Sequence, residues 1–192
     1  MLNNYYLKKS WAQWQANHDD LTGLVNRREF ERQFSQLWEN KTSQVHSLLY
    51  MDLDRFKIVN DTCGHDAGDE LLRQISQVLQ AQILESNTLA RLGGDEFAAI
   101  LYGCSQQDAL TIAEAILNTI QKFSFVWQEQ NFTVGISIGL ISFKPQEDIL
   151  TSVLKTSDAA CYGAKNSGRN QIYVIDKPQS VPKSQAVKLN KI

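Results

Sequence analysis

The chain has 192 residues, of which 43% are hydrophobic and 21% are charged, so it is long and apolar enough to fold as one globular domain. All 21 acidic residues lie between positions 19 and 176, whereas the two flanks carry only lysines as charged side chains. A body this acidic argues against binding to a nucleic-acid backbone, which attracts basic surfaces.

Cysteine usage and hydropathy bear on the compartment. Cys63, Cys104 and Cys161 are odd in number and lack the spacing of metal ligands, so free thiols in a reducing environment are expected. The sequence has no apolar run of about 18 residues and no signal peptide at its N-terminus. These features predict a soluble, cytoplasmic protein with no membrane span in this chain.

Apolar periodicity predicts a chain in which helices and strands alternate. The expected helices lie at 4–17, 26–40, 56–62, 67–83, 106–123 and 149–166. The expected strands lie at 45–53, 89–92, 97–101, 132–142 and 171–175. The second and third strands flank Gly93 and Gly94, which is typical of a hairpin with a Gly-rich turn. This order predicts an α+β sandwich with a mixed, mainly antiparallel sheet flanked by helices.

Composition divides the chain into three parts. Residues 1–18 form an expected helical stem, in which Leu7, Trp11 and Trp14 share one face that covers either its own domain or a dimer partner. Residues 19–176 form the main domain. Residues 177–192 form a polar, basic tail that is expected to be a linker or disordered.

Two acidic pairs fall at the ends of predicted strands. Asp52 and Asp54 close the first strand, and Asp95 and Glu96 occupy the hairpin turn. If the strands are neighbours in the sheet, these carboxylates converge on one edge, where without basic partners they repel one another and favour a hard cation such as Mg²⁺. Phosphoryl-transfer sites use such a cation, with phosphates and water completing its octahedron. A solvated acidic turn is the alternative for either pair alone.

Glycine and basic residues near these pairs suit a phosphorylated ligand. Gly93 and Gly94 permit a positive φ and the close approach of a bulky group, although no P-loop or dinucleotide fingerprint is present. Possible phosphate contacts are Lys57, Arg91, Lys165 and Arg169, although a single lysine or arginine is more often a solvated surface charge. Lys165 and Arg169 are four apart at a helix end and are expected to share a face.

Two short polar residues suggest how a base could be recognised. Asn60 and Asp69 lie near predicted helix ends, and an amide together with a carboxylate can read the edge of guanine, since the carboxylate accepts from N1–H and N2–H. Helix capping by the same residues is an equal alternative.

Four segments resemble the GGDEF-domain diguanylate cyclases, in that family's order and spacing, over about 19–175: DDLTGLVNRR (19–28), MDLDRFKIVNDTCGHDAGDELL (51–72), RLGGDEF (91–97) and DAACYGAKNSGRN (158–170). The resemblance implies a nucleotidyl-cyclase-like and polymerase-palm-like fold. It also implies that two GTP molecules are condensed across a homodimer to cyclic di-GMP and two pyrophosphates, with Mg²⁺, or else Mn²⁺, as cofactor. The alternatives are a degenerate module that binds GTP without catalysis and a scaffold that only dimerises through its N-terminal helix.

The resemblance also implies a role for each matching residue. Asp52 and the backbone carbonyl of Leu53 match the metal ligands, together with Asp95 and Glu96. Asp95 also matches the proposed general base, and Lys57 the residue that stabilises the transition state. The residues expected to bind substrate are Asn60, His65, Asp69, Gly93, Gly94, Arg91, Lys165 and Arg169.

One motif of the family is missing. The product-inhibition motif RxxD would begin at position 84, but Leu84 and Asn87 occupy its two functional positions, so no inhibitory site is predicted. The residues that precede the matching region are too few to form a sensory domain. If this chain is a fragment of a longer protein, an upstream sensory domain is expected.

Overall fold

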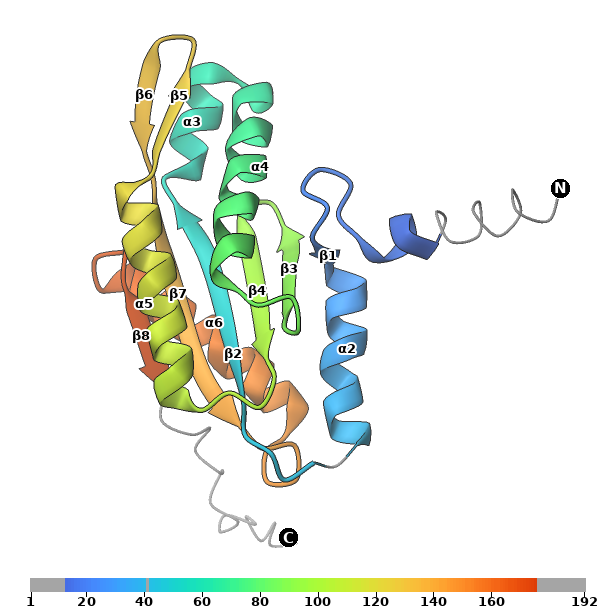
Figure 1. The fold of residues 1–192 in the computed structure, drawn as a ribbon. Helices are drawn as coiled ribbons and strands as arrows, with labels where there is room; N and C mark the ends of the chain where they lie inside the picture. The colour runs from blue at the N-terminus through green and yellow to red at the C-terminus, as the bar shows by residue number, and fades with distance from the viewer. Residues whose placement is uncertain (1–12, 41, 176–192) are drawn as a thin grey trace, which may run out of the picture.

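The computed structural model describes residues 13–40 and 42–175 (Figure 1). Its centre is a six-stranded mixed sheet with the strand order β1-β3-β4-β2-β7-β8. The strands of this sheet are β1 (Val25–Asn26), β2 (His46–Asp54), β3 (Thr88–Gly93), β4 (Glu96–Leu101), β7 (Gly135–Phe143) and β8 (Ile172–Ile175). A separate two-stranded sheet consists of β5 (Ser124–Trp127) and β6 (Gln130–Thr133).

Helices cover both faces of the six-stranded sheet. They are α2 (Arg27–Glu39), α3 (Phe56–Cys63), α4 (His65–Gln82), α5 (Gln106–Lys122) and α6 (Leu150–Asn166). In Figure 1, α4 and α5 lie in front of the sheet and α6 lies behind it. Successive side chains of a strand point to opposite faces, so Leu49 of β2 packs in the core with α4 and α5, whereas Leu48 packs with α2 and α6. No helix in the described ranges is long and apolar enough to cross a lipid bilayer.

The central strand β2 determines which polar residues meet. It pairs antiparallel with β4 on one side and with β7 on the other. In this register Asp52 lies opposite Glu96 of β4 and opposite Ser137 of β7. Because paired residues of antiparallel strands project to the same face, Asp52 and Glu96 share the face that α2 and α6 cover.

The predicted fold class is confirmed, as are most helices and strands. Asn26 caps α2 by accepting the N–H of Glu29, and Ser105 caps α5 by accepting the N–H of Asp108. The helix predicted at 67–83 begins two residues earlier, at His65, directly after Gly64. β1 was not predicted, because two residues are too short for a recognisable strand pattern.

The strand predicted over 132–142 is wrong as a single element. The structure divides it into β6 and β7 and adds β5, which the sequence analysis did not predict. β5 and β6 form a hairpin whose turn residues, Gln128 and Glu129, both have positive φ, at 44° and 66°. Such turns usually contain Asn-Gly or Asp-Gly, so the sequence carried no ordinary hairpin signal here.

The predicted stem and tail lie largely outside the described residues. Within the stem, residues 13–17 are helical, and the Trp14 indole is 40% exposed and stacks on the His18 ring at a centroid distance of 4.5 Å. Leu7, Trp11 and the tail 177–192 are not among the described residues.

Candidate active site at the acidic edge of the sheet

The ends of β2 and of the β3–β4 hairpin bring the predicted acidic residues together. Asp52 lies opposite Glu96, and the backbone N–H of Leu53 donates to the Asp95 carbonyl oxygen at 3.2 Å. The hairpin turn contains Gly93 and Gly94, whose φ values of 146° and 53° are unfavourable for other residues. The expectation that β2 and the hairpin are neighbours in the sheet is therefore confirmed.

Asp52 and Asp54 are the buried carboxylates at this edge. Oδ2 of Asp52 contacts Nζ of Lys165 at 2.6 Å, whereas Oδ1 of Asp52 is buried and has no hydrogen-bond partner. Burial raises the pKa of the Asp52 carboxyl to about 6; the nearby charges of Asp95 and Glu96 act in the same direction and Lys165 opposes them. The premise that these carboxylates lack basic partners is wrong, because α6 delivers Lys165 from the other end of the sequence.

Glu96 also has a basic partner. Nη2 of Arg27 lies 3.3 Å from Oε2 of Glu96, and Nε of Arg27 donates to the carbonyl oxygen of Leu92 at 2.8 Å. Arg27, the first residue of α2, therefore contacts both arms of the hairpin. No role was predicted for Arg27, although it lies in the segment 19–28 that resembles the GGDEF family. Its place in that segment was the only sequence feature that could have indicated Arg27, because no local pattern relates it to Glu96, 69 positions further along the chain.

Asp54 has a different environment from Asp52. Its two carboxylate oxygens accept hydrogen bonds from the Ser137 hydroxyl at 2.9 and 3.0 Å, and Oδ2 also accepts from the backbone N–H of Asn170 at 2.8 Å. These bonds tie the end of β2 to β7 and to the loop between α6 and β8. Both oxygens of Asp54 thus have hydrogen-bond partners within the protein. The acidic residues that remain candidates for binding a cation are Asp52, Asp95 and Glu96.

The candidate ligands suit a cation that the protein holds with few side chains. Within residues 13–40 and 42–175, no three His, Cys, Asp or Glu side chains gather closely enough to enclose a metal by themselves. Mg²⁺ characteristically uses one or two carboxylates and takes its other ligands from phosphates and water. The unpartnered Oδ1 of Asp52, with Asp95 and Glu96 nearby, fits that mode of binding.

The residues expected to read a base lie on the helical pair next to β2. Asn60 is on α3 and the half-buried Asp69 is on α4, with the turn at Gly64, where φ is 85°, between the two helices. Oδ1 of Asn60 is buried without a hydrogen-bond partner. Lys57 on α3 and His65 at the start of α4 are exposed. Lys57 and His65 are thus open to solvent and Asp69 is partly so, whereas the side-chain oxygen of Asn60 is enclosed.

The basic residues expected to contact phosphates have unequal environments. Lys165 is paired with Asp52, whereas the exposed Arg169 lies beyond α6, which ends at Asn166. Arg169 has φ of 65°, and with Asp54 and Arg55 it lines an open cavity of about 760 Å³. The expectation that Lys165 and Arg169 share a helix face is wrong, because the helix stops before Arg169.

Arg91 is held inside the protein. Its Nη1 lies 3.0 and 3.1 Å from the two carboxylate oxygens of Asp19, and its Nε donates to the Gly94 carbonyl oxygen at 2.9 Å. Despite burial, hydrogen bonds from Thr22 and Arg91 lower the pKa of Asp19. Arg91 therefore connects the turn after the stem to the hairpin, and a contact with phosphate stays a prediction that requires this ion pair to open.

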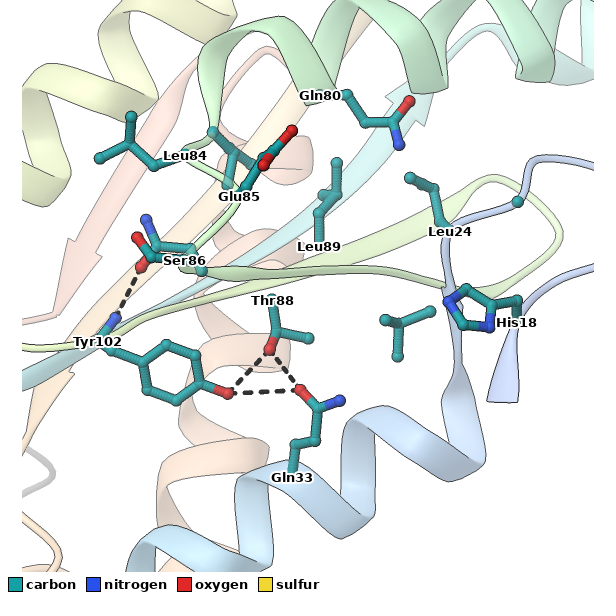
Figure 2. Close-up of a pocket in the computed structure, with 14 residues that line it drawn as sticks. His18, Leu24, Gln33, Gln80, Leu84, Glu85, Ser86, Thr88, Leu89 and Tyr102 are labelled. Carbon is teal, nitrogen blue, oxygen red and sulfur yellow. Dashed lines mark hydrogen bonds between the residues drawn. The ribbon is translucent and has the colours of Figure 1, made fainter. Parts of the chain in front are cut away.

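A second cavity lies at the position of the missing inhibitory motif (Figure 2). It measures about 740 Å³, and no lysine or arginine is among the described residues that line it. Leu84 is 72% exposed at its rim, and Oδ1 of Asn87 accepts the backbone N–H of Tyr102 at 3.0 Å. Figure 2 also shows the hydroxyls of Thr88 and Tyr102 pointing toward Gln33.

The sheet order, the flanking helices and the acidic strand ends define an α+β sandwich of the nucleotidyl-cyclase type. A family model described as "Diguanylate cyclase, GGDEF domain" matches residues 16–171, and the chain belongs to the GGDEF family. A solved structure of the coiled coil and GGDEF domain of DgcB from Caulobacter crescentus, in complex with c-di-GMP, aligns with a TM-score of 0.84 at 27% identity. It covers 91% of this chain and 93% of that one.

Two relatives show how this domain occurs in longer proteins. The chain is 39% identical over 174 residues to the probable diguanylate cyclase DgcE of Escherichia coli, covering 90% of this chain and 16% of DgcE. It is 37% identical over 175 residues to the cyclic di-GMP phosphodiesterase PdeB of Shewanella oneidensis, covering 88% of this chain and 20% of PdeB. The chain therefore spans a fifth or less of either relative.

Proposed function

We propose that this chain is an active diguanylate cyclase that condenses two GTP molecules to cyclic di-GMP and two pyrophosphates. One observation carries the proposal: among the described residues, the only buried side-chain nitrogen or oxygen atoms without a hydrogen-bond partner are Oδ1 of Asp52 and Oδ1 of Asn60. An unpaired buried acceptor costs free energy, so such atoms need a functional explanation. A cation would satisfy the first oxygen, and N–H donors of a guanine base the second.

Different residues bind different parts of the nucleotide. Asn60 and Asp69 receive the guanine, and Arg169 and Lys165 the phosphates. Lys165 then exchanges its present partner, Asp52, for a phosphate oxygen once Asp52 serves as a cation ligand. When bound, Mg²⁺ makes the 3'-hydroxyl more acidic and offsets negative charge on the α-phosphate.

The chemical step is a displacement at the α-phosphorus atom. The 3'-oxygen of one GTP forms the new phosphodiester bond while the bond to pyrophosphate breaks, and the carboxylate of Asp95 accepts the hydroxyl proton. Lys57, exposed on α3, offsets charge that develops on the phosphate. Each chain binds one GTP, so the two nucleotides face one another only in an antiparallel homodimer.

A degenerate module that binds GTP without turnover is the second candidate. It is favoured by the similarity to PdeB, a protein named for cyclic di-GMP phosphodiesterase activity. The presence of Asp52, Asp95, Glu96 and Lys57 supports the active enzyme instead.

A product assay separates these candidates. Purified protein is incubated with GTP and Mg²⁺, and cyclic di-GMP is quantified by chromatography, with the Asp95→Asn variant as a control. Formation of cyclic di-GMP by the wild type alone is the expected result. GTP binding without product would identify the degenerate module. Absence of both GTP binding and product would identify a scaffold.

A further inference from the structure

Gly68 of α4 faces the side chain of Asn60 on the adjacent helix α3. A methyl group at position 68 would lie 1.8 Å from Oδ1 of Asn60, 2.8 Å from its Cγ and 3.2 Å from Cζ of Phe56. Non-bonded carbon and oxygen atoms normally stay beyond about 3.3 Å. The observed position of the Asn60 amide is therefore compatible only with glycine at position 68.

The backbone does not explain why this residue is glycine. Gly68 lies inside α4 with helical geometry, and its N–H bonds to the carbonyl oxygen of Gly64 at 3.4 Å. Glycine is a weaker helix former than alanine at such a position. The feature that a glycine supplies here is the space beside its Cα, which the buried and unpartnered Oδ1 of Asn60 fills.

We propose that Gly68 is a positioning residue for base recognition, because the space it leaves holds the Asn60 amide in the orientation that meets the purine edge. This inference rests on the proposed function, in which that base is the guanine of GTP. Any side chain at position 68 would push the amide of Asn60 away from α4, while both helices would still form.

The chain offers a matched control at Gly163. This residue lies inside α6, and a methyl group there would sit 3.5 Å from the ring of Tyr173, an ordinary van der Waals contact. Gly163→Ala thus replaces a helical glycine by the better helix former without displacing a side chain of the proposed site. Any effect of Gly68→Ala that Gly163→Ala lacks comes from the surroundings of position 68.

The experiment measures GTP affinity by calorimetry with Mg²⁺ present for the wild type, Gly68→Ala, Gly163→Ala, Asn60→Ala and the double variant Asn60→Ala/Gly68→Ala. We expect Gly68→Ala to bind GTP about tenfold more weakly, as the loss of a well-placed hydrogen bond predicts. Gly163→Ala should match the wild type. The double variant should bind no more weakly than Asn60→Ala alone, because Gly68 acts only through Asn60.

A second readout needs no nucleotide. In ¹⁵N-labelled protein, the side-chain amide signal of Asn60 should shift in Gly68→Ala and stay in place in Gly163→Ala. If Gly68→Ala fails to fold, the double variant should fold again, since removal of the Asn60 amide makes room for the methyl group; a double variant that is also unfolded would overturn the inference.

The remaining outcomes separate this inference from the function on which it rests. The positioning role would be overturned by unchanged GTP affinity in Gly68→Ala or by an Asn60 signal that does not move. It would also be overturned if Gly68→Ala reduced the GTP affinity of the wild type and of Asn60→Ala by the same factor. A wild type that binds no GTP, together with a shifted Asn60 signal, would overturn the proposed substrate while supporting the contact between Gly68 and Asn60.

Discussion

Asp52 combines burial, two nearby carboxylates and a single lysine partner. Lys165 contacts one of its oxygens at 2.6 Å, yet the pKa of Asp52 is still raised to about 6. A raised pKa means that the folded protein disfavours the ionised form relative to the unfolded chain. Asp52 thus lowers stability in its charged state, which is the expected cost of a carboxylate kept for binding a cation.

Asp52→Asn is therefore expected to separate stability from activity. The folded pKa lies above the usual value of 3.8, so wild-type stability should fall as pH rises from about 4 to about 6. The variant should be more stable than the wild type at pH 8, by on the order of 1 kcal/mol, and equal to it near pH 4. Urea unfolding with a chelator present measures this difference.

The same variant should produce no cyclic di-GMP from GTP and Mg²⁺ at any pH. Turnover near the wild-type rate by folded Asp52→Asn would remove Asp52 from the proposed metal site. A variant less stable than the wild type at pH 8 would show that the pairing with Lys165 outweighs the cost of burial.

Arg27 and Arg28 form a natural pair for comparison. Arg27 contacts Leu92 and Glu96 on the hairpin, whereas Arg28 contacts the carbonyl oxygen of Ala16 and the side chain of Asn17. We expect Arg27→Met to reduce cyclic di-GMP formation about tenfold, because Glu96 loses its partner, and Arg28→Met to leave it within twofold. Both should change the unfolding free energy by less than about 1 kcal/mol, since the arginines are exposed. Equal activities of the two variants would contradict a role for Arg27 in orienting the hairpin.

At the scale of elements, the β3–β4 hairpin is held from two sides. Arg27 at the start of α2 contacts its two arms, and Arg91 connects its turn to Asp19. The hairpin carries Asp95 and Glu96 with two flexible glycines before them. These contacts restrict a turn that glycine would otherwise leave mobile, so the acidic edge keeps its shape.

The cavity beside β3 leads to a prediction about product inhibition. Its described lining includes Leu84 and Asn87 and no lysine or arginine that could grip a phosphate. Cyclic di-GMP should therefore inhibit only weakly, by competition at the active half-site. Titration of product into a steady-state assay measures this, and strong non-competitive inhibition at low micromolar product would contradict the prediction.

The variant Leu84→Arg/Asn87→Asp tests the same cavity in the opposite direction. An aspartate at 87 can still accept the Tyr102 N–H that Asn87 accepts now, so the fold should be retained. We expect this variant to gain non-competitive inhibition by cyclic di-GMP. Unchanged inhibition would show that the cavity is unsuited to the product for reasons beyond these two residues.

At the scale of the whole molecule, the described residues contain one acidic edge and one helical pair, α3 and α4, that is proposed to bind the base. Two nucleotides must meet for the proposed reaction, so the specific activity should rise with protein concentration until the dimer is complete. A dilution series assayed for cyclic di-GMP, with the mass measured by ultracentrifugation at the same concentrations, tests this. Constant specific activity from a protein that remains monomeric would contradict a shared site.

The sequence determined the fold class and most elements, and it indicated candidate site residues whose roles stay predictions. Ser105 caps a helix as predicted, and a dense apolar run marks the buried strand that becomes β2, because these signals act between neighbours in the chain. The two-residue strand β1 and the β5–β6 hairpin were missed; the turn of that hairpin, at Gln128 and Glu129, has no usual turn residues.

Only the tertiary structure decided which partners these residues have. Arg27 and Glu96 are 69 positions apart and Asp54 and Asn170 are 116 apart, yet both pairs are in contact. Lys165 of α6 and Asp52 of β2 are likewise far apart in the sequence and in contact in the structure. Local periodicity specifies which face a residue takes, but contacts across the sheet depend on strand order and register. The chain reaches that arrangement only when it buries both faces of the sheet at once.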